Sequence, residues 1–365
     1  MNRSSISRKK VLYILHGIQI GGVEVALVSA IPRLNREFDL QVIALGKIND
    51  RITASLTPDE KSRLHAFDYP LYQYPFAVFG IISFVFKFNP DIMICSLWRA
   101  SMIGIIVKSF QRKIQFFSFI HSAGFTHILN RVFSSMAVKI ADHVLVDSKA
   151  TADFVKSKIR PRAPIQIVSF CLEAQNINQE LRELDPKEIR IMFLGRINPV
   201  KNLPKTIDAI HYLRSKGHNV SLDIYGKPEG TEQGLVEYIY QKGLVDQVHF
   251  KGELYHSQSK VMNDYHFLIQ LSSREGMAMS VAEAMQNGLV CIVTPVGEIP
   301  NYSQDMQNAI FIDIQNQENW IPSLTKVEQV IRDPILYSSL SKASRKQFEN
   351  VKIYSESLIE QLNAI

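Results

Sequence analysis

The sequence predicts an α/β protein with two Rossmann-like, doubly wound domains in tandem. Short apolar runs, each long enough for one buried strand, alternate with segments whose apolar residues recur at helical spacing. This alternation pauses once, at a basic stretch with two prolines (156–164) and a polar loop (173–188). The 365 residues are about twice the length of an average domain, and 46% of them are hydrophobic, which is enough for two cores.

The first half begins with a strand, a glycine loop and a helix. Val11–Leu15 is a continuous apolar run, His16–Gly22 is rich in glycine, and Val23–Leu34 has apolar residues at helical spacing. The elements expected after them are the strand Leu40–Leu45, a buried helix at Phe76–Phe88, and the strands Asp91–Ser96, Ile114–Ile120 and His143–Val146. Because strands separated by helices pair in parallel, we expect ligands at the carboxyl ends of the strands.

The second half repeats this pattern. It opens with the strand Ile189–Leu194 and a helix at about Leu203–Lys216. The later elements expected are the strand Ser221–Tyr225, a helix near Leu235–Lys242, the strands Val248–Phe250 and Phe267–Leu271, the helix Val281–Asn287 and the strand Val290–Thr294. The tail, Ser338–Ile365, has the spacing of one or two amphipathic helices.

Charge is distributed unevenly along the chain. Residues 1–170 carry 22 basic and 11 acidic side chains, whereas residues 171–365 carry 19 basic and 24 acidic ones. The net charge of +6 is compatible with nucleic-acid binding, but the sequence contains no known nucleic-acid-binding module. We therefore expect no nucleic acid among the partners.

Three features favour a cytoplasmic protein. The three cysteines are widely spaced, so they offer neither a disulfide framework nor a CxxC site. The apolar run Val11–Leu15 is too short for the core of a signal peptide. The longest apolar stretch, Phe76–Phe88, has 13 residues, and a bilayer needs about 20. We expect no membrane-spanning helix.

The first glycine loop is a candidate anion site. Gly21 and Gly22 allow backbone to approach a ligand, and the helix that begins at Val23 offers unpaired N–H groups. The loop is neither a GxGxxG dinucleotide fingerprint nor a GxxxxGK[ST] phosphate loop. The alternative is a tight turn that binds nothing.

Two cations follow the strand Ile189–Leu194. Arg196 and Lys201 lie five residues apart on one loop, where a guanidinium and an ammonium together could stabilise the charge on a departing diphosphate. The alternative is a turn whose cations only face water.

Two carboxylates follow the strand Phe267–Leu271. Glu275 falls in the loop and Glu283 in the first turn of the next helix, so both can face the same crevice, where a carboxylate can accept the two hydroxyl protons of a sugar diol. The alternative for Glu283 is a capping role, because Ser280 three residues earlier completes a capping-box pattern.

His121 ends the apolar run Ile114–Ile120, so its imidazole is expected at the carboxyl end of a strand. A hydrogen bond to a transferred group is one interpretation, and a structural histidine is the other. His16, at the end of the first strand, has the same two interpretations with less context.

Together these motifs resemble the retaining, nucleotide-sugar-dependent glycosyltransferases of group 1, or family 4. That family has the GT-B fold, in which two Rossmann-like domains face each other across an interdomain cleft. The motifs that carry the resemblance are Gly21-Gly22-x-Glu24, His121, Asp142-x5-Ser148, Gly195-Arg196-x4-Lys201-Asn202, Tyr225-Gly226, and Glu275-Gly276-x6-Glu283-Ala284-Met285 with Gly288. They occur in order and span most of the chain.

The resemblance implies a division of labour. Residues 1–170 would bind the acceptor, residues 171–345 the nucleotide sugar, and residues 346–365 would form a C-terminal helix that packs back on the N-terminal domain. The implied catalytic residues are His121, Arg196, Lys201 and Glu275. The implied donor-binding residues are Gly21, Gly22, Arg196, Lys201, Glu275, Gly276, Met277, Ala278, Met279, Ser280 and Glu283.

Within that set the resemblance implies specific roles. Arg196 and Lys201 would bind the donor diphosphate, and Glu283 the ribose. Glu275 would lie near the donor sugar, residues 277–280 would face phosphate through their backbone, and His121 would contact the sugar being transferred. Met277, Met279, Val290 and Asn301 depart from the commonest family pattern, which puts the identity of the donor sugar in doubt.

The resemblance also implies the substrates. The donor would be a UDP- or GDP-sugar, and the acceptor a glycan or a lipid-linked glycan of a bacterial surface polysaccharide such as capsule or lipopolysaccharide. The sequence has no D-x-D triplet, so we expect no metal and no other cofactor. Two alternatives are a sugar-nucleotide 2-epimerase of the same fold and a non-catalytic nucleotide-sugar-binding protein.

A basic region lies in the first half. Residues 99–162 contain eleven basic and three acidic side chains. Interleaved with them are Phe110, Phe116, Phe117, Phe119, Phe125 and Phe133. One interpretation is a surface that docks on an anionic membrane, at the inner face of the cytoplasmic membrane. The alternative is a solvated basic face with the aromatic residues in the core.

Overall fold

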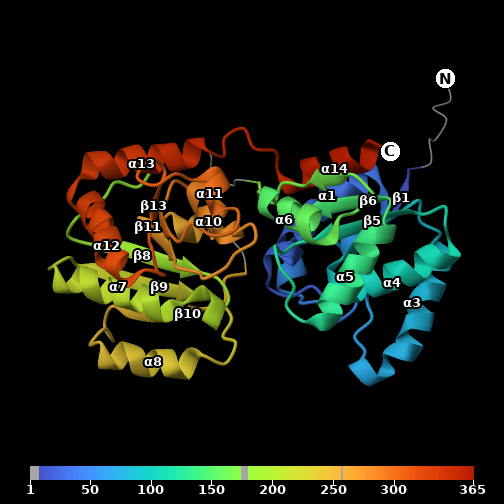
Figure 1. The fold of residues 1–365 in the computed structure, drawn as a ribbon, viewed down its shortest axis with the longest axis horizontal. Helices are drawn as coiled ribbons and strands as arrows, with labels where there is room; N and C mark the ends of the chain where they lie inside the picture. The colour runs from blue at the N-terminus through green and yellow to red at the C-terminus, as the bar shows by residue number, and fades with distance from the viewer. Residues whose placement is uncertain (1–7, 174–179, 256–257) are drawn as a thin grey trace. The chain divides into compact units, whose positions relative to one another are not determined.

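The computed structural model describes residues 8–173, 180–255 and 258–365. It divides the chain into two compact units. The N-terminal unit runs to Leu172 and also includes Lys352–Ile365, and the C-terminal unit is Glu173–Val351. The polar loop expected at 173–188 lies partly outside the described residues. Each unit is a parallel sheet with helices between its strands (Figure 1), which confirms the predicted fold class.

The N-terminal unit has, in its described part, a seven-stranded parallel sheet with the order β3-β2-β1-β4-β5-β6-β7. Its strands are β1 (Lys10–Leu15), β2 (Asp39–Ala44), β3 (Leu64–Ala66), β4 (Ile92–Ser96), β5 (Gln115–Ile120), β6 (His143–Val146) and β7 (Ile165–Ile167). Its helices are α1 (Gly22–Glu37), α2 (Pro58–Ser62), α3 (Tyr74–Phe88), α4 (Leu97–Phe110), α5 (Ile128–Ile140), α6 (Lys149–Phe154) and α14 (Tyr354–Asn363). The direction of strand addition reverses between β1 and β4, so the loops after these two strands form the topological switch point.

The C-terminal unit has a six-stranded parallel sheet in its described part, with the order β10-β9-β8-β11-β12-β13. Its strands are β8 (Ile189–Leu194), β9 (Val220–Tyr225), β10 (Val248–Gly252), β11 (Phe267–Gln270), β12 (Val290–Val293) and β13 (Ala309–Phe311). Its helices are α7 (Leu203–Ser215), α8 (Glu232–Gln241), α9 (Gln258–Met262), α10 (Met279–Gln286), α11 (Ile299–Tyr302), α12 (Gln317–Arg332) and α13 (Pro334–Lys346). Its switch point lies between β8 and β11.

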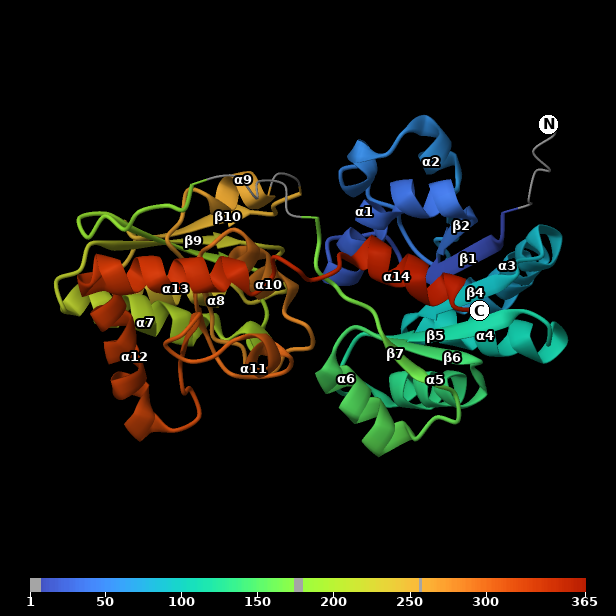
Figure 2. The same cartoon turned by 90° about the horizontal axis from the view of Figure 1, so that it is seen from above.

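The C-terminal helix α14 belongs to the N-terminal unit. Figures 1 and 2 both show it beside α1. Tyr354, Leu358 and Leu362 are buried on one face of α14, at the spacing of a single helical stripe. The chain returns to this unit through a hydrogen bond from the Tyr354 N–H to the Cys171 carbonyl (2.8 Å).

The prediction of a buried helix at Phe76–Phe88 is half wrong. The helix forms as α3, but Phe79 is 73% exposed and Phe86 is also exposed, and among its described side chains only Ile81 and Val85 are buried. Because the segment is apolar on every side, its pattern cannot show which face meets the core, and length and hydropathy alone suggested burial.

The aromatic residues of the basic region differ in burial, and Phe125 and Phe133 are partly buried. Phe116, Phe117 and Phe119 lie on β5 and are fully buried, because a central strand of a parallel sheet is covered on both faces. Phe110, at the end of α4, is 73% exposed. The core interpretation is therefore correct for the strand residues, and a membrane surface cannot use them.

No helix in the described part of the chain is long and apolar enough to cross a bilayer. Cys95, Cys171 and Cys291 are buried free thiols.

Candidate active site

The loop after β8 carries Arg196 and Lys201 and rests on the loop after β9. The Gly195 N–H donates to the Tyr225 carbonyl (3.0 Å), and the Ile197 N–H donates to the Lys227 carbonyl (2.8 Å). Gly226, with a φ of +153°, lies directly against Gly195, and a Cβ at Gly226 would overlap the Gly195 carbonyl oxygen. This close approach requires glycine at position 226 and fixes where the loop that carries Arg196 and Lys201 leaves the sheet.

Lys201 and Glu275 are brought together at the switch point. Lys201 ends a short 3₁₀ turn whose N-cap, Asn198, accepts from the Lys201 N–H. Its Nζ donates to Glu275 Oε1 at 2.7 Å, with side-chain exposures of 14% and 10%. The pair joins the loops after the adjacent strands β8 and β11. In a nearly buried ion pair of this kind, the attraction between the charges offsets the loss of hydration only when the two groups are well aligned.

Arg196 has a different partner. Its side chain is 59% exposed, and Nη1 contacts Glu229 Oε1 at 3.2 Å. Asn198 Nδ2 donates to the other oxygen of the same carboxylate (2.8 Å). The structure thus ties Arg196 to Glu229, whereas Lys201 is tied to Glu275. Glu229 was missed in the sequence because it lies in a polar loop with no recognisable motif.

Gln270 is a second residue that the motifs did not reveal. It is the last residue of β11 and is fully buried. Its Nε2 donates to Glu275 Oε1 at 2.8 Å, and its Oε1 accepts from Ser280 Oγ at 2.7 Å. The sequence did contain one indication, since Gln270 is the single polar residue in the apolar run Phe267–Leu271. A polar group buried in such a strand needs hydrogen-bond partners.

Glu283 lies in the second turn of α10, not in the first turn as expected, and does not cap the helix. The helix begins at Met279 after Ala278, which adopts a left-handed conformation (φ +54°), and Ser280 inside the helix bonds Gln270 instead of forming a capping box. The capping alternative for Glu283 is therefore wrong. Burial raises the pKa of the Glu283 carboxyl to about 7. No hydrogen bond to this carboxyl is found among the described residues, and the residue as a whole is partly exposed.

The loop between Glu275 and α10 is shaped by its backbone. Gly297 has a φ of +62°, and a Cβ there would lie 2.5 Å from the Glu275 carbonyl oxygen and 2.6 Å from that of Gly276. The Glu298 N–H donates to the same Gly276 carbonyl (2.9 Å), and Tyr302 Oη donates to the Met277 carbonyl (3.4 Å). The left-handed Ala278 adds local strain, a feature common at binding loops.

In the N-terminal unit, His121 follows β5 as predicted. Its Nε2 lies 2.7 Å from Ser96 Oγ at the end of β4, and its ring lies 4.2 Å from that of Phe119. Burial lowers the pKa of His121 to about 3, so the imidazole is neutral at physiological pH. Its buried Nδ1 has no hydrogen-bond partner among the described residues.

His16 is occupied by the fold. Its Nε2 accepts from the Arg99 backbone N–H (2.9 Å), and burial together with the Arg99 charge lowers its pKa to about 4. Its ring meets Trp98 edge-on at 5.7 Å. These contacts favour the structural interpretation of His16.

The first glycine loop has an internal carboxylate. α1 begins at Gly22, and Gly21 precedes it in extended conformation. The Glu24 carboxylate lies so close to Gly21 that a Cβ at that position would overlap it. A negative charge of the chain itself is thus already present in the first turn of α1, where the sequence suggested that an external anion binds.

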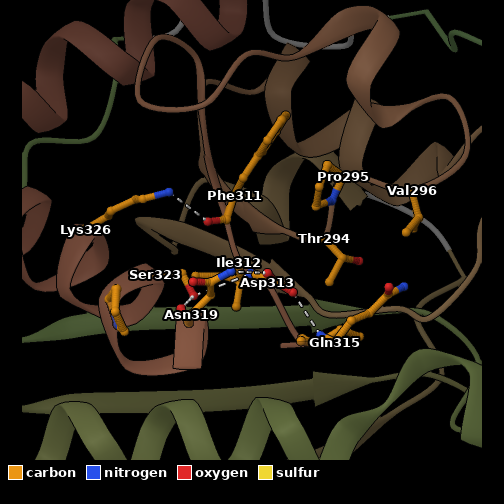
Figure 3. A pocket seen from close by; sticks show the side chains of 12 residues that line it. Thr294, Pro295, Val296, Phe311, Ile312, Asp313, Gln315, Asn319, Ser323 and Lys326 are labelled. Atoms are coloured by element: carbon orange, nitrogen blue, oxygen red, sulfur yellow. Dashed lines mark hydrogen bonds between the residues drawn. The ribbon is translucent and has the colours of Figure 1, made fainter. Parts of the chain in front are cut away.

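A cavity of about 490 Å³ lies elsewhere in the C-terminal unit (Figure 3). It sits beyond the carboxyl ends of β12 and β13, between Thr294–Val296 and residues of α12 such as Asn319 and Lys326. Asp313, at its base, accepts from Asn319 Nδ2 (2.8 Å). No residue of the predicted site lines this cavity.

The described residues contain no group of three or more His, Cys, Asp or Glu side chains that could hold a metal ion.

Two family models match the chain. The model described as Glycosyltransferase Family 4 matches residues 20–171, and the model described as Glycosyl transferases group 1 matches residues 175–347. Together they cover nearly all of both units and confirm the resemblance that the motifs indicated.

Two curated relatives are similar in sequence. The capsular polysaccharide biosynthesis glycosyltransferase CapH of Staphylococcus aureus is 21% identical over 335 residues, which cover 87% of this chain and 90% of the relative. The lipopolysaccharide 1,2-N-acetylglucosaminetransferase of Salmonella typhimurium is 25% identical over 179 residues, 44% of this chain and 46% of the relative.

Solved structures share the fold. Anabaena Alr3699/HepE in complex with UDP and glucose has a TM-score of 0.80 at 16% identity and covers 98% of this chain and 100% of its own. Sucrose-phosphate synthase from Thermosynechococcus elongatus has a TM-score of 0.77 at 14% identity with the same coverage. At these identities the likeness establishes the fold alone.

Proposed function

Because the chain belongs to the group 1 and family 4 glycosyltransferases and has their GT-B fold, we propose that it transfers a hexose or related sugar from a UDP-sugar to a glycan or lipid-linked acceptor. The names of CapH and of the lipopolysaccharide N-acetylglucosaminetransferase support a role in a bacterial surface polysaccharide. We also propose that the reaction takes place in the cytoplasm.

The observation that carries the proposal is the Lys201–Glu275 pair at the switch point of the C-terminal sheet. Ligands of doubly wound sheets bind at this edge. The pair offers an ammonium for a diphosphate and a carboxylate for sugar hydroxyls within one contact of 2.7 Å. Glu283, whose carboxyl pKa is raised by burial, would gain two hydroxyl donors from a ribose diol.

In the proposed reaction the bond between the anomeric carbon and the diphosphate oxygen breaks, and an acceptor oxygen takes its place at that carbon. Lys201 and the first turn of α10 would stabilise the negative charge that grows on the diphosphate, and Arg196 would join them by leaving Glu229. The acceptor proton would pass to the departing phosphate oxygen on the same face of the sugar, which retains the anomeric configuration.

UDP is the preferred donor nucleotide in this proposal. Several structural neighbours are described as complexes with UDP or UDP-glucose, including Alr3699/HepE and the pneumococcal O-GlcNAc transferase GtfA. A GDP-sugar remains the competing donor.

The purified protein should be incubated with labelled UDP- and GDP-sugars and with lipid-linked acceptors. Transfer of label to the acceptor supports the proposal. Release of UDP with an epimerised sugar would identify an epimerase instead, and retention of intact donor would identify a binding protein.

Sugar transfer is expected to persist in excess EDTA, because Lys201 and the α10 N-terminus would supply the positive charge that a divalent cation provides elsewhere. The rate should be compared before and after chelation, with added Mg²⁺ or Mn²⁺ as the reversal control. A strict requirement for either cation would contradict a metal-free donor site.

We further propose that the N-terminal unit docks on an anionic membrane through the layer formed by α3, α4 and α5, which lie side by side in Figure 1. An exposed apolar stripe runs along α5 and consists of Ile128, Leu129, Val132, Met136 and Ile140. Residues 74–141 contain seven basic side chains and one acidic one, Asp91, although one of the seven, Lys108, is mostly buried and pairs with Asp142. Arg131 and Lys139 are exposed on α5 itself. A helix face of this composition suits the interface of an anionic bilayer.

Full-length protein is expected to sediment with vesicles that contain phosphatidylglycerol at low salt, and not with neutral vesicles. Replacing Arg131 and Lys139 by Gln should weaken binding about fivefold for each charge. Val132→Gln should also weaken it, whereas Val236→Gln on exposed α8 should not. Failure of the wild type to sediment, or equal loss in the α8 control, would refute this surface.

A further inference from the structure

Gln270 connects two parts of the donor site that are separate in sequence. Its side-chain amide donates to Glu275 in the loop after β11 and accepts from Ser280 in the first turn of α10. These two partners define the orientation of the amide, because a reversed amide would place its oxygen against the Glu275 carboxylate.

The position of Gln270 in the fold does not by itself require an amide. The other residues of β11 are apolar, and the strand is fully buried. Leu268, two residues earlier on the same face of the sheet, is buried without a polar group. A leucine at 270 would satisfy the strand equally well, so the amide serves the loop and the helix that it bonds.

Glu275 Oε1 receives two donors, Lys201 Nζ at 2.7 Å and Gln270 Nε2 at 2.8 Å. Among the described residues, Oε2 of the same carboxylate accepts no hydrogen bond. Under the proposed function the donor diphosphate competes with Glu275 for Lys201, because both are anions. Gln270 is neutral and is held by Ser280, so it does not take part in that competition.

We infer that Gln270 is a positioning residue, which holds the Glu275 carboxylate in place when the donor diphosphate draws on Lys201 and so leaves Oε2 to accept from a hydroxyl of the donor sugar. This inference rests on the proposed function. Under this inference, recognition of the donor sugar depends on the Gln270 amide, although that amide contacts neither the sugar nor the nucleotide. Recognition of the nucleotide does not depend on it. The bond from Ser280 fixes the orientation of the amide that holds Glu275.

The test uses full-length Gln270→Leu, which keeps the strand apolar and removes both hydrogen bonds. Its affinity for UDP is expected to stay within about twofold of the wild type, whereas its affinity for UDP-glucose or UDP-N-acetylglucosamine, whichever the wild type binds, should fall about tenfold or more. Its kcat should fall as well, because the sugar is held less precisely at the reacting carbon.

Two further variants separate positioning from simple loss of stability. Ser341→Ala removes another buried hydrogen bond of the same unit, from Ser341 Oγ to the Gly288 carbonyl, and should lower Tm without changing the ratio of UDP-sugar to UDP affinity. Gln270→Glu keeps the shape but sets a second carboxylate beside Glu275. Its activity should recover toward acid pH, where the two carboxyls share a proton.

An unchanged ratio of UDP-sugar to UDP affinity in Gln270→Leu, with wild-type binding intact, would overturn the positioning role alone. A pH profile of Gln270→Glu that matches the wild type would do the same. If the wild type binds neither UDP nor a UDP-sugar, the proposed donor site is wrong and the inference falls with it.

Discussion

Lys201→Ala is expected to lower kcat/KM for sugar transfer by about 10²- to 10³-fold, the usual cost of losing one group that stabilises charge in a transition state. The C-terminal unit should remain folded, because Gln270 still donates to the Glu275 carboxylate that Lys201 leaves. Initial rates over a range of donor concentrations, with Tm measured on the same preparation, check both statements.

The matched control is Lys205→Ala. Lys205 lies four residues further on in α7, where its ammonium sits over the Trp320 ring at 4.8 Å, and it carries the same charge. If Lys205→Ala loses as much activity as Lys201→Ala, the loss comes from the change in net charge and not from a lost contact between Lys201 and the diphosphate. Full activity in Lys201→Ala would show that the diphosphate binds elsewhere.

Glu283→Gln is expected to weaken donor binding by tenfold or more and to stabilise the fold at the same time. Charged hydrogen bonds of about 1.5–3 kcal/mol are lost with the carboxylate, which accounts for the first effect. The second follows because the folded pKa of about 7 lies above the ordinary value of 4.5, so folding favours the protonated form.

The raised pKa of Glu283 determines how the stability of the fold depends on pH. Below pH 4.5 the carboxyl is protonated in both the folded and the unfolded protein and costs nothing. Between pH 4.5 and 7 the unfolded chain loses its proton first, so this group lowers stability as pH rises, and above 7 the cost is complete. Glu283→Gln should lack this decline.

Donor binding has the opposite dependence. The ionised carboxylate accepts the ribose hydroxyls, so wild-type affinity for UDP should fall as pH drops below about 7, whereas the affinity of Glu283→Gln should stay flat. Tm and UDP affinity measured from pH 5 to 8 in both proteins give the comparison. A stability loss in Glu283→Gln, or equal donor affinity in the two proteins, would mean that Glu283 is a structural residue.

Much of the architecture could be predicted from the sequence because buried parallel strands consist of nearly continuous apolar runs. Val11–Leu15 is such a run, Ile189–Leu194 is one except for Arg190, and the structure places β1 and β8 there. Loops that follow them are short, so the residues just after each strand necessarily meet at one edge of the sheet. That is why Lys201 and Glu275, 74 residues apart, could be expected in the same site before their contact was seen.

The remaining features depend on side-chain partners that spacing does not encode. Arg196 was expected beside Lys201, but the ends of a long side chain are placed by whatever carboxylate is near, here Glu229. The exposure of α3 could not be read from a segment that is apolar on every side. Gln270 stands in an apolar strand, and only its contacts with Glu275 and Ser280 show its purpose.

Nucleotide-sugar binding, measured by thermal shift in the presence of EDTA, tests most directly whether Lys201, Glu275 and Glu283 form the donor site. The assay compares UDP-, GDP-, ADP- and CMP-sugars on the wild type and on Lys201→Ala. We expect a UDP-sugar to raise the Tm of the wild type clearly and that of Lys201→Ala little or not at all. A Tm unaffected by every nucleotide sugar, or raised equally in both proteins, would show that these residues do not form the donor site.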